Sequence, residues 1–128
     1  MKIIISQDKR IVLFEDDDIS NAYLKSDALK NFEIIGLIND NDFLVKDHDD
    51  KIYSIPTVPL DSDHLEPFHF NIETEEKVTE LKILWYVQPL IFGGSPFAKE
   101  NMKKVDLETH IGLVNWWNDK YKEIKRED

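Results

Sequence analysis

Carboxylates dominate the middle of this chain, and carboxylates do chemistry in two main ways: they attract basic partners, or they hold metal ions. Between Asp40 and Glu80 the sequence has twelve Asp or Glu and three Lys. That window therefore carries nine of the ten net negative charges of the 128-residue chain. A regional negative field attracts basic proteins and repels nucleic acids and anionic membranes. We therefore expect a basic protein partner, with no nucleic acid and no membrane among the partners.

The acidic residues best placed to meet such a partner lie in turns and in a long polar loop. Asn and Asp separate three β-prone runs, and a loop punctuated by prolines follows them. Complementary charge at such positions raises the association rate and fixes the register of a complex. The alternative is that Asp and Asn serve only as good turn formers. The expected partner-binding residues are Asp40, Asp42, Asp47, Asp49, Asp50, Asp61, Asp63 and, from the helix described below, Trp116.

The same loop groups residues of the types that bind metals or transfer protons. These oxygen and imidazole groups are Asp61, Asp63, His64, Glu66 and His69. Their spacing matches no zinc, calcium or metalloprotease motif. Nor does the glycine pair at 93–94 belong to a nucleophile elbow or a phosphate-binding loop. We therefore expect no catalytic residue, no cofactor and no metal site. The alternative is a small hydrolase or metal-dependent enzyme that uses His64, His69 or His110 with nearby carboxylates.

Alternating apolar residues predict strands over much of the chain. Residues 3–6 and 11–14 indicate a hairpin joined by a polar connection, and three further runs indicate a β-meander. Two more strands are expected after the long loop. The five later ranges are 33–38, 43–46, 51–55, 68–72 and 81–87. The last of them is apolar on both faces, which is typical of a central strand.

Two segments have the spacing of helices. Residues 16–29 begin with aspartates that suit a helix N-terminus. Residues 106–125 predict a longer helix that is capped by Asp106. At about 100° per residue, its apolar stripe contains Leu107, His110, Ile111, Leu113, Val114, Trp117, Tyr121 and Ile124. Trp116 falls on the opposite face, where its ring is either covered by the 93–104 loop or offered to a partner.

These elements predict one α+β domain over residues 1–128. An antiparallel β-sheet, built of a meander and hairpins, would be covered by the long C-terminal helix and one N-terminal helix. The chain has no cysteine, which excludes disulfides and thiolate metal sites. The apolar run at residues 3–5 is too short for a signal peptide or a membrane span. We therefore expect a cytoplasmic protein.

One stretch of the sequence resembles a known class of protein. The residues from Trp85 to Pro96 read WYVQPLIFGGSP, and they are followed by Asn101, His110 and the run VNWWN at 114–118. This pattern resembles the tails of small bacterial proteins encoded at toxin-immunity loci. The likeness covers the last third of the chain and carries over no functional residues, and residues 1–80 match no immunity family. The resemblance implies a cytoplasmic protein that binds and neutralises a cognate toxin.

Charge and resemblance together favour a small acidic protein-binding module of the immunity type. Such a module would dock on a basic toxin domain, a nuclease for example, and block access to its active site by occlusion. Besides the enzyme alternative, a second one stays open. This is a structural or phage-type adaptor that self-assembles through exposed strands or Trp116.

Overall fold

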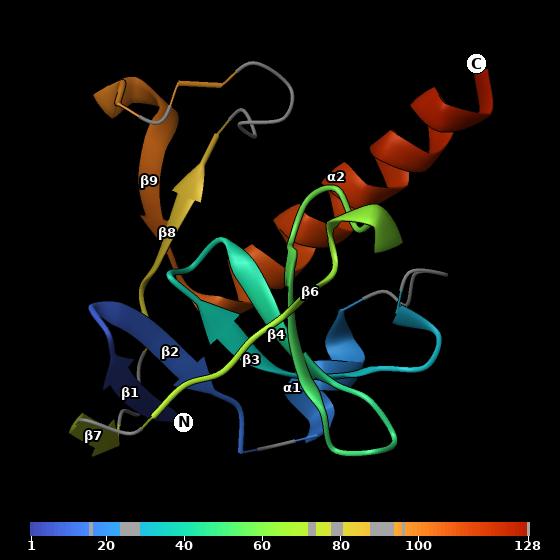
Figure 1. Cartoon of the computed structure of the whole chain (residues 1–128). Coiled ribbons are helices and arrows are strands. Elements are labelled where there is room, and N and C mark those ends of the chain that lie inside the picture. The colour runs from blue at the N-terminus through green and yellow to red at the C-terminus, as the bar shows by residue number, and fades with distance from the viewer. Residues whose placement is uncertain are drawn as a thin grey trace.

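The computed structural model describes residues 1–15, 17–23, 29–71, 74–77, 81–87, 94–95 and 97–127. Within them, a seven-stranded antiparallel sheet, a two-stranded sheet and a long C-terminal helix form a mixed α+β arrangement (Figure 1). The strands of the large sheet are β1 (Lys2–Ser6), β2 (Lys9–Leu13), β3 (Glu33–Ile38), β4 (Asp42–Lys46), β5 (Ile52–Pro56), β6 (Glu66–Pro67) and β7 (Thr74–Lys77). The remaining elements are α1 (Asp17–Ala22), η2 (Ser62–His64), β8 (Ile83–Tyr86), η4 (Lys99–Asn101), β9 (Met102–Val105) and α2 (Leu107–Glu127).

The predicted meander is confirmed, because each strand from β1 to β6 pairs with the next one along the chain. The order across the sheet is β6-β5-β4-β3-β2-β1-β7. Two of its hairpins turn through residue pairs with positive φ, Gln7 with Asp8 and Asn39 with Asp40. Such pairs are typical of the tight turns whose twist matches that of the flanking strands. The polar turns predicted from sequence therefore set the register of the sheet.

Both faces of the large sheet are apolar. On one face Val12, Leu37 and Phe43 lie opposite one another on neighbouring strands and are fully buried. On the other face Ile4 and Ile11 belong to a second buried cluster. An apolar face exposed to water is costly, so each face requires a cover.

The first face is covered by α2 and by the small sheet. Val114 of α2 and Ile83 and Trp85 of β8 belong to the same buried cluster as the sheet residues. Asp106 caps α2, since its Oδ1 accepts a 2.8 Å hydrogen bond from the backbone N–H of Thr109. Hydrogen bonds from Thr109 also lower the pKa of Asp106. The predicted helix, its cap and the described part of its apolar stripe are confirmed.

The second face is covered by the segment that follows β6. This segment leaves one edge of the sheet at β6 and reaches β7 at the other edge, so it crosses the face (Figure 1). Phe68 and Phe70 pack on the second cluster as it crosses. The backbone N–H of Asn71 donates a 3.0 Å hydrogen bond to Ser6 Oγ, and Lys9 Nζ lies 4.9 Å from the centre of the Phe68 ring. The alternating phenylalanines thus form a strap over the sheet.

Three expectations from sequence are corrected by the structure. The helix expected over 16–29 is not seen at that length: α1 has six residues, and residues 16 and 24–28 lie outside the described part. The described part of 68–72 is the strap and forms no strand. β8 is no central strand either, because it pairs only with β9 among the described residues. Its two apolar faces reflect its position in the first cluster, against α2.

The close approach of β3 to β2 makes a testable prediction at Gly36. A Cβ there would overlap the main-chain carbonyl of Val12, which cannot move without separating the two strands. We expect Gly36→Ala to lower the free energy of unfolding by about 2–3 kcal/mol in denaturant titration. Gly112→Ala is the matched control, since a Cβ at that helical position meets nothing within 4 Å. It should stabilise the protein by about 0.5–1 kcal/mol. Equal stability of Gly36→Ala and wild type would contradict this strand packing.

Candidate functional site

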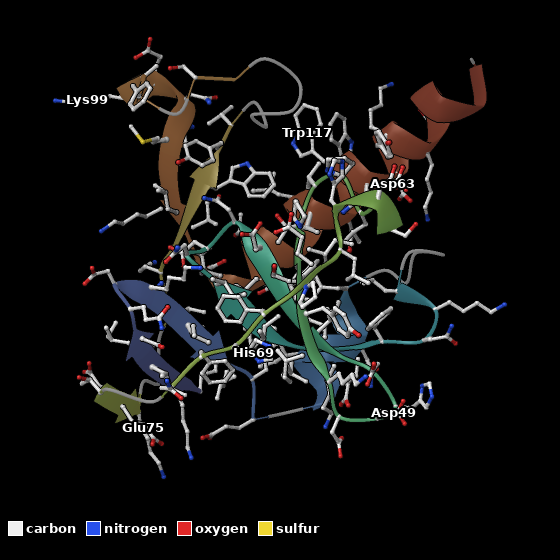
Figure 2. The ribbon with its side chains drawn as sticks, viewed as in Figure 1. Asp49, Asp63, His69, Glu75, Lys99 and Trp117 are labelled. Atoms are coloured by element: carbon white, nitrogen blue, oxygen red, sulfur yellow. The ribbon has the colours of Figure 1, made fainter. Side chains whose placement is uncertain are left out.

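The aspartates expected to bind a partner do not form one patch. The β3–β4 turn and the β4–β5 turn lie at opposite ends of β4, because both strand pairs are antiparallel. At about 3.4 Å per residue, Asp42 and Asp47 are separated by roughly 17 Å along the strand. Asp61 and Asp63 lie elsewhere again, at η2, well away from Asp49 (Figure 2). The acidic groups thus occupy three separate places.

Asp40 holds the two sheets together. Its Oδ1 accepts a 2.6 Å hydrogen bond from Arg10 Nη1 on β2, and its Oδ2 accepts a 3.0 Å hydrogen bond from the backbone N–H of Leu84 on β8. The side chain is largely buried, so both bonds are screened little by solvent. One carboxylate therefore joins β2, the β3–β4 turn and the small sheet.

Two more of these aspartates accept hydrogen bonds within the chain, and a third is partly buried. Asp47 Oδ1 accepts hydrogen bonds from the backbone N–H groups of Asp49 and Lys51, which fixes the β4–β5 turn. Asp61 caps η2 and accepts a 3.1 Å hydrogen bond from the Tyr121 hydroxyl. Asp42 is half-buried, and burial raises its pKa. The aspartates with exposed side chains are Asp49, Asp50 and Asp63.

Trp116 lies on the exposed face of α2, as its helical phase predicts. It is 57 % exposed, so the described residues leave most of its surface uncovered. Its ring meets the Trp117 ring edge to face at a centroid distance of 4.9 Å. One turn before it, Gly112 leaves open space on the same face of the helix. An exposed indole thus stands beside a gap in the helix surface.

Asn118 fixes the position of α2, and this role was not predicted from the sequence. Its Oδ1 accepts a 2.8 Å hydrogen bond from the backbone N–H of Leu60, and its Nδ2 donates to the carbonyls of Thr57 and Val114. A buried amide with such bonds orients a helix strongly. The sequence could have indicated its burial, because position 118 lies one helical turn after Val114, on the flank of the apolar stripe. Trp116 is consequently displayed from a helix that is held in place.

His110 lies at the junction of α1, α2 and β8, and it is fully buried. Its Nδ1 is 2.8 Å from the Tyr23 hydroxyl, and the Trp85 ring meets its ring edge to face at 5.6 Å. Nε2 has no hydrogen-bond partner among the described residues. Burial lowers the pKa of His110 to about 4 and raises that of Tyr23. His110 is therefore a neutral core residue.

The histidines of the enzyme alternative are distributed over separate elements. His64 and His69 are exposed, on η2 and on the strap, whereas His110 is in the core. Figure 2 shows His69 in front of the sheet, apart from Asp63 of η2. Among the described residues, no group of three or more His, Asp or Glu could hold a metal ion. The loop residues from Asp61 to His69 are not brought together as a site.

Comparison with known proteins assigns neither a family nor a function to this chain. No protein-family model matches the chain, and searches of curated proteins and of solved structures found no match. In the described part of the chain, no helix combines the length and the apolar character needed to cross a membrane. The functional interpretation therefore depends on the geometry given above.

The burial of His110 predicts a pH-dependent stability. Its pKa is about 4 in the folded state, against about 6.5 in an unfolded chain. The unfolded state therefore binds a proton that the folded state excludes, and stability falls as the pH drops from 6.5 towards 4. Between pH 8 and pH 5 we expect His110 to account for a loss of about 2 kcal/mol in the free energy of unfolding.

The measurement is denaturant titration of wild type and His110→Gln at both pH values. The variant removes the titrating group, so its own loss should be smaller by that amount. Carboxylates contribute equally to both proteins and cancel in the difference. Equal losses in the two proteins would show that His110 is accessible to protons in the folded state.

Proposed function

We propose that this chain is an acidic protein-binding module of the immunity type, which neutralises a basic partner by covering its active site. The observation that carries the proposal is the exposed Trp116 beside Gly112 on a helix that Asn118 holds in place. Neither residue is needed there for packing within the described structure.

The chemistry of this face suits an interface anchor. Tryptophan is enriched among residues that dominate binding energy, because it buries a large rigid surface and loses little side-chain entropy. Mid-helix glycine costs about 1 kcal/mol relative to alanine, and no atom of the described residues lies within 4 Å of the position that a Cβ at Gly112 would take. A partner side chain can enter that gap and stack against the indole. Asp119, Lys120 and Glu123 are exposed around this position and would form the polar rim.

The net charge of −10 supports a basic partner. The exposed Asp49 and Asp50 lie in the β4–β5 turn and the exposed Asp63 lies in η2, so they would act through the field of the whole molecule. Such a field speeds the encounter and orients the partner before contact. Asp40, Asp47 and Asp61 contribute to the same field while their side chains hold the fold. The proposal places the chain in the cytoplasm, where an immunity protein meets its toxin.

The contact made by Trp116 can be tested by capture and titration. Wild-type protein is used as bait in a lysate of the organism that encodes it, and the captured protein is purified and titrated. We expect Trp116→Ala to raise the Kd for that protein at least about 30-fold, equivalent to about 2 kcal/mol. Its free energy of unfolding should change by less than about 1 kcal/mol, because the residue is mostly exposed.

Two further variants accompany this experiment. Phe97→Ala is the control and should leave the Kd unchanged, because it truncates an aromatic residue that is 87 % exposed and belongs to the segment before η4, whose Lys99 lies apart from α2 (Figure 2). Gly112→Ala should stabilise the protein and yet weaken binding. The captured protein should also inhibit growth when expressed alone and lose that effect when co-expressed with this chain. An unchanged Kd for Trp116→Ala would show that Trp116 is not an anchor of the interface.

The electrostatic part makes a separate prediction about rates. Replacing Asp49 and Asp63 together by Lys should lower the association rate constant with the captured protein about tenfold at low salt. Replacing the same pair by Asn, which changes the charge half as much, should give about half the effect on the logarithm of the rate constant. Stopped-flow fluorescence over a range of salt concentrations measures both. Association rates that are identical to wild type at every salt concentration would exclude steering by these residues.

A further inference from the structure

The outer edges of β6 and β7 in the large sheet, and those of β8 and β9 in the small sheet, have no strand partner in the described structure, and β7 and β9 are the two that carry runs of like charge. β7 is the last strand of the large sheet, and β9 pairs only with β8. Each strand therefore has one edge whose backbone N–H and C=O groups have no strand partner among the described residues. Both strands lie on the left of Figure 1, β9 above and β7 below. Unpaired edges are templates for pairing with another chain.

The two edges carry opposite charges in the same pattern. β7 reads Thr-Glu-Glu-Lys and all four of its residues are exposed. β9 reads Met-Lys-Lys-Val, with both lysines exposed. Glu75 forms an ion pair with Lys2, at 3.1 Å. Within the described structure, Glu76, Lys103 and Lys104 form no ion pair, so their charges face solvent.

We propose that β9 of one copy adds to the β7 edge of a second copy, so that the small sheet of one molecule extends the large sheet of the other. This self-association goes beyond the proposed function and is independent of it, because it uses neither the Trp116 face nor its neighbours. Main-chain hydrogen bonds would supply the attraction, and the charged side chains would select the pairing.

The charge pattern restricts the register of such a pair. When the two four-residue strands are aligned end to end, both glutamates face lysines. This holds for the antiparallel and the parallel direction, because each charged pair is central. Opposite charges directly across a sheet stabilise it by about 0.2–1 kcal/mol for each pair, and like charges destabilise it. A slip that places Lys77 opposite either lysine of β9 is therefore disfavoured.

The same charges disfavour the competing pairings in this end-to-end alignment. Two β7 edges would place glutamates opposite glutamates, and two β9 edges would place lysines opposite lysines. In this alignment only the unlike edges place opposite charges across from each other. Because each copy carries a net charge of −10, the general repulsion between copies opposes association and is weakened by added salt. Whether the contact is reciprocal decides between a closed dimer and longer assemblies.

The test uses two charge-swapped variants and their mixture. Variant one is Glu75→Lys with Glu76→Lys, which makes both edges basic. Variant two is Lys103→Glu with Lys104→Glu, which makes both edges acidic. All four residues are exposed, so folding should be retained. Sedimentation velocity over a concentration series should show wild type associating and each variant alone remaining monomeric.

The mixture of the two variants gives the decisive result. Each edge of variant one then finds an edge of opposite charge on variant two, so a heteromeric complex should appear. Asp49→Lys/Glu108→Lys is the matched control for variant one, because it has the same net charge as variant one but keeps the original edges. Alone, this control protein should associate as wild type does.

Two results would overturn the proposal. One is a wild type that stays monomeric up to its solubility limit. The other is an associating wild type whose mass is unchanged in both charge-swapped variants. Neither result would affect the role proposed for Trp116. The capture experiment measures the binding of a different protein to a different surface.

Discussion

A sheet with two apolar faces is the constraint on which the rest of this structure depends. Neither cluster of buried side chains can remain in contact with water, so the chain must supply a cover for each face. A long helix and a small sheet cover one face, and a strap with Phe68 and Phe70 covers the other. The return of the chain to β7 follows from this, because the strap ends at the opposite edge.

The cover on the first face determines which surfaces remain available for function. α2 turns its stripe towards the sheet, and Asn118 fixes it there through three hydrogen bonds. The described residues leave the opposite face of the helix largely exposed, and Trp116 lies on it. The small sheet is attached through the Asp40 carboxylate and stands beside the large one, and the outer edge of β9 has no strand partner in the described part of the chain. Both candidate interfaces therefore result from the way the first face is covered.

Local features of the sequence predicted much of this fold, whereas partners distant in sequence did not emerge from it. The meander, its turns and α2 were predictable because alternation, turn residues and helical spacing act over a few residues. β8 was misplaced because burial between a sheet and a helix produces the same apolar pattern as a central strand. Asp40 was correctly expected in a turn, yet its bonds to Arg10 and Leu84 span 30 and 44 residues. Helical phase placed Trp116 on the face opposite the apolar stripe, but it left open whether the 93–104 loop covers the ring.

The most direct test of the central claim is photo-crosslinking at position 116 in living cells. Trp116 is replaced by p-benzoylphenylalanine, and the same substitution at Phe97 serves as the comparison. On irradiation, the account predicts that position 116 forms an adduct with one basic protein other than this chain, and that position 97 does not. If position 116 yields no adduct while position 97 captures a partner, the face of α2 that carries Trp116 is not the docking surface.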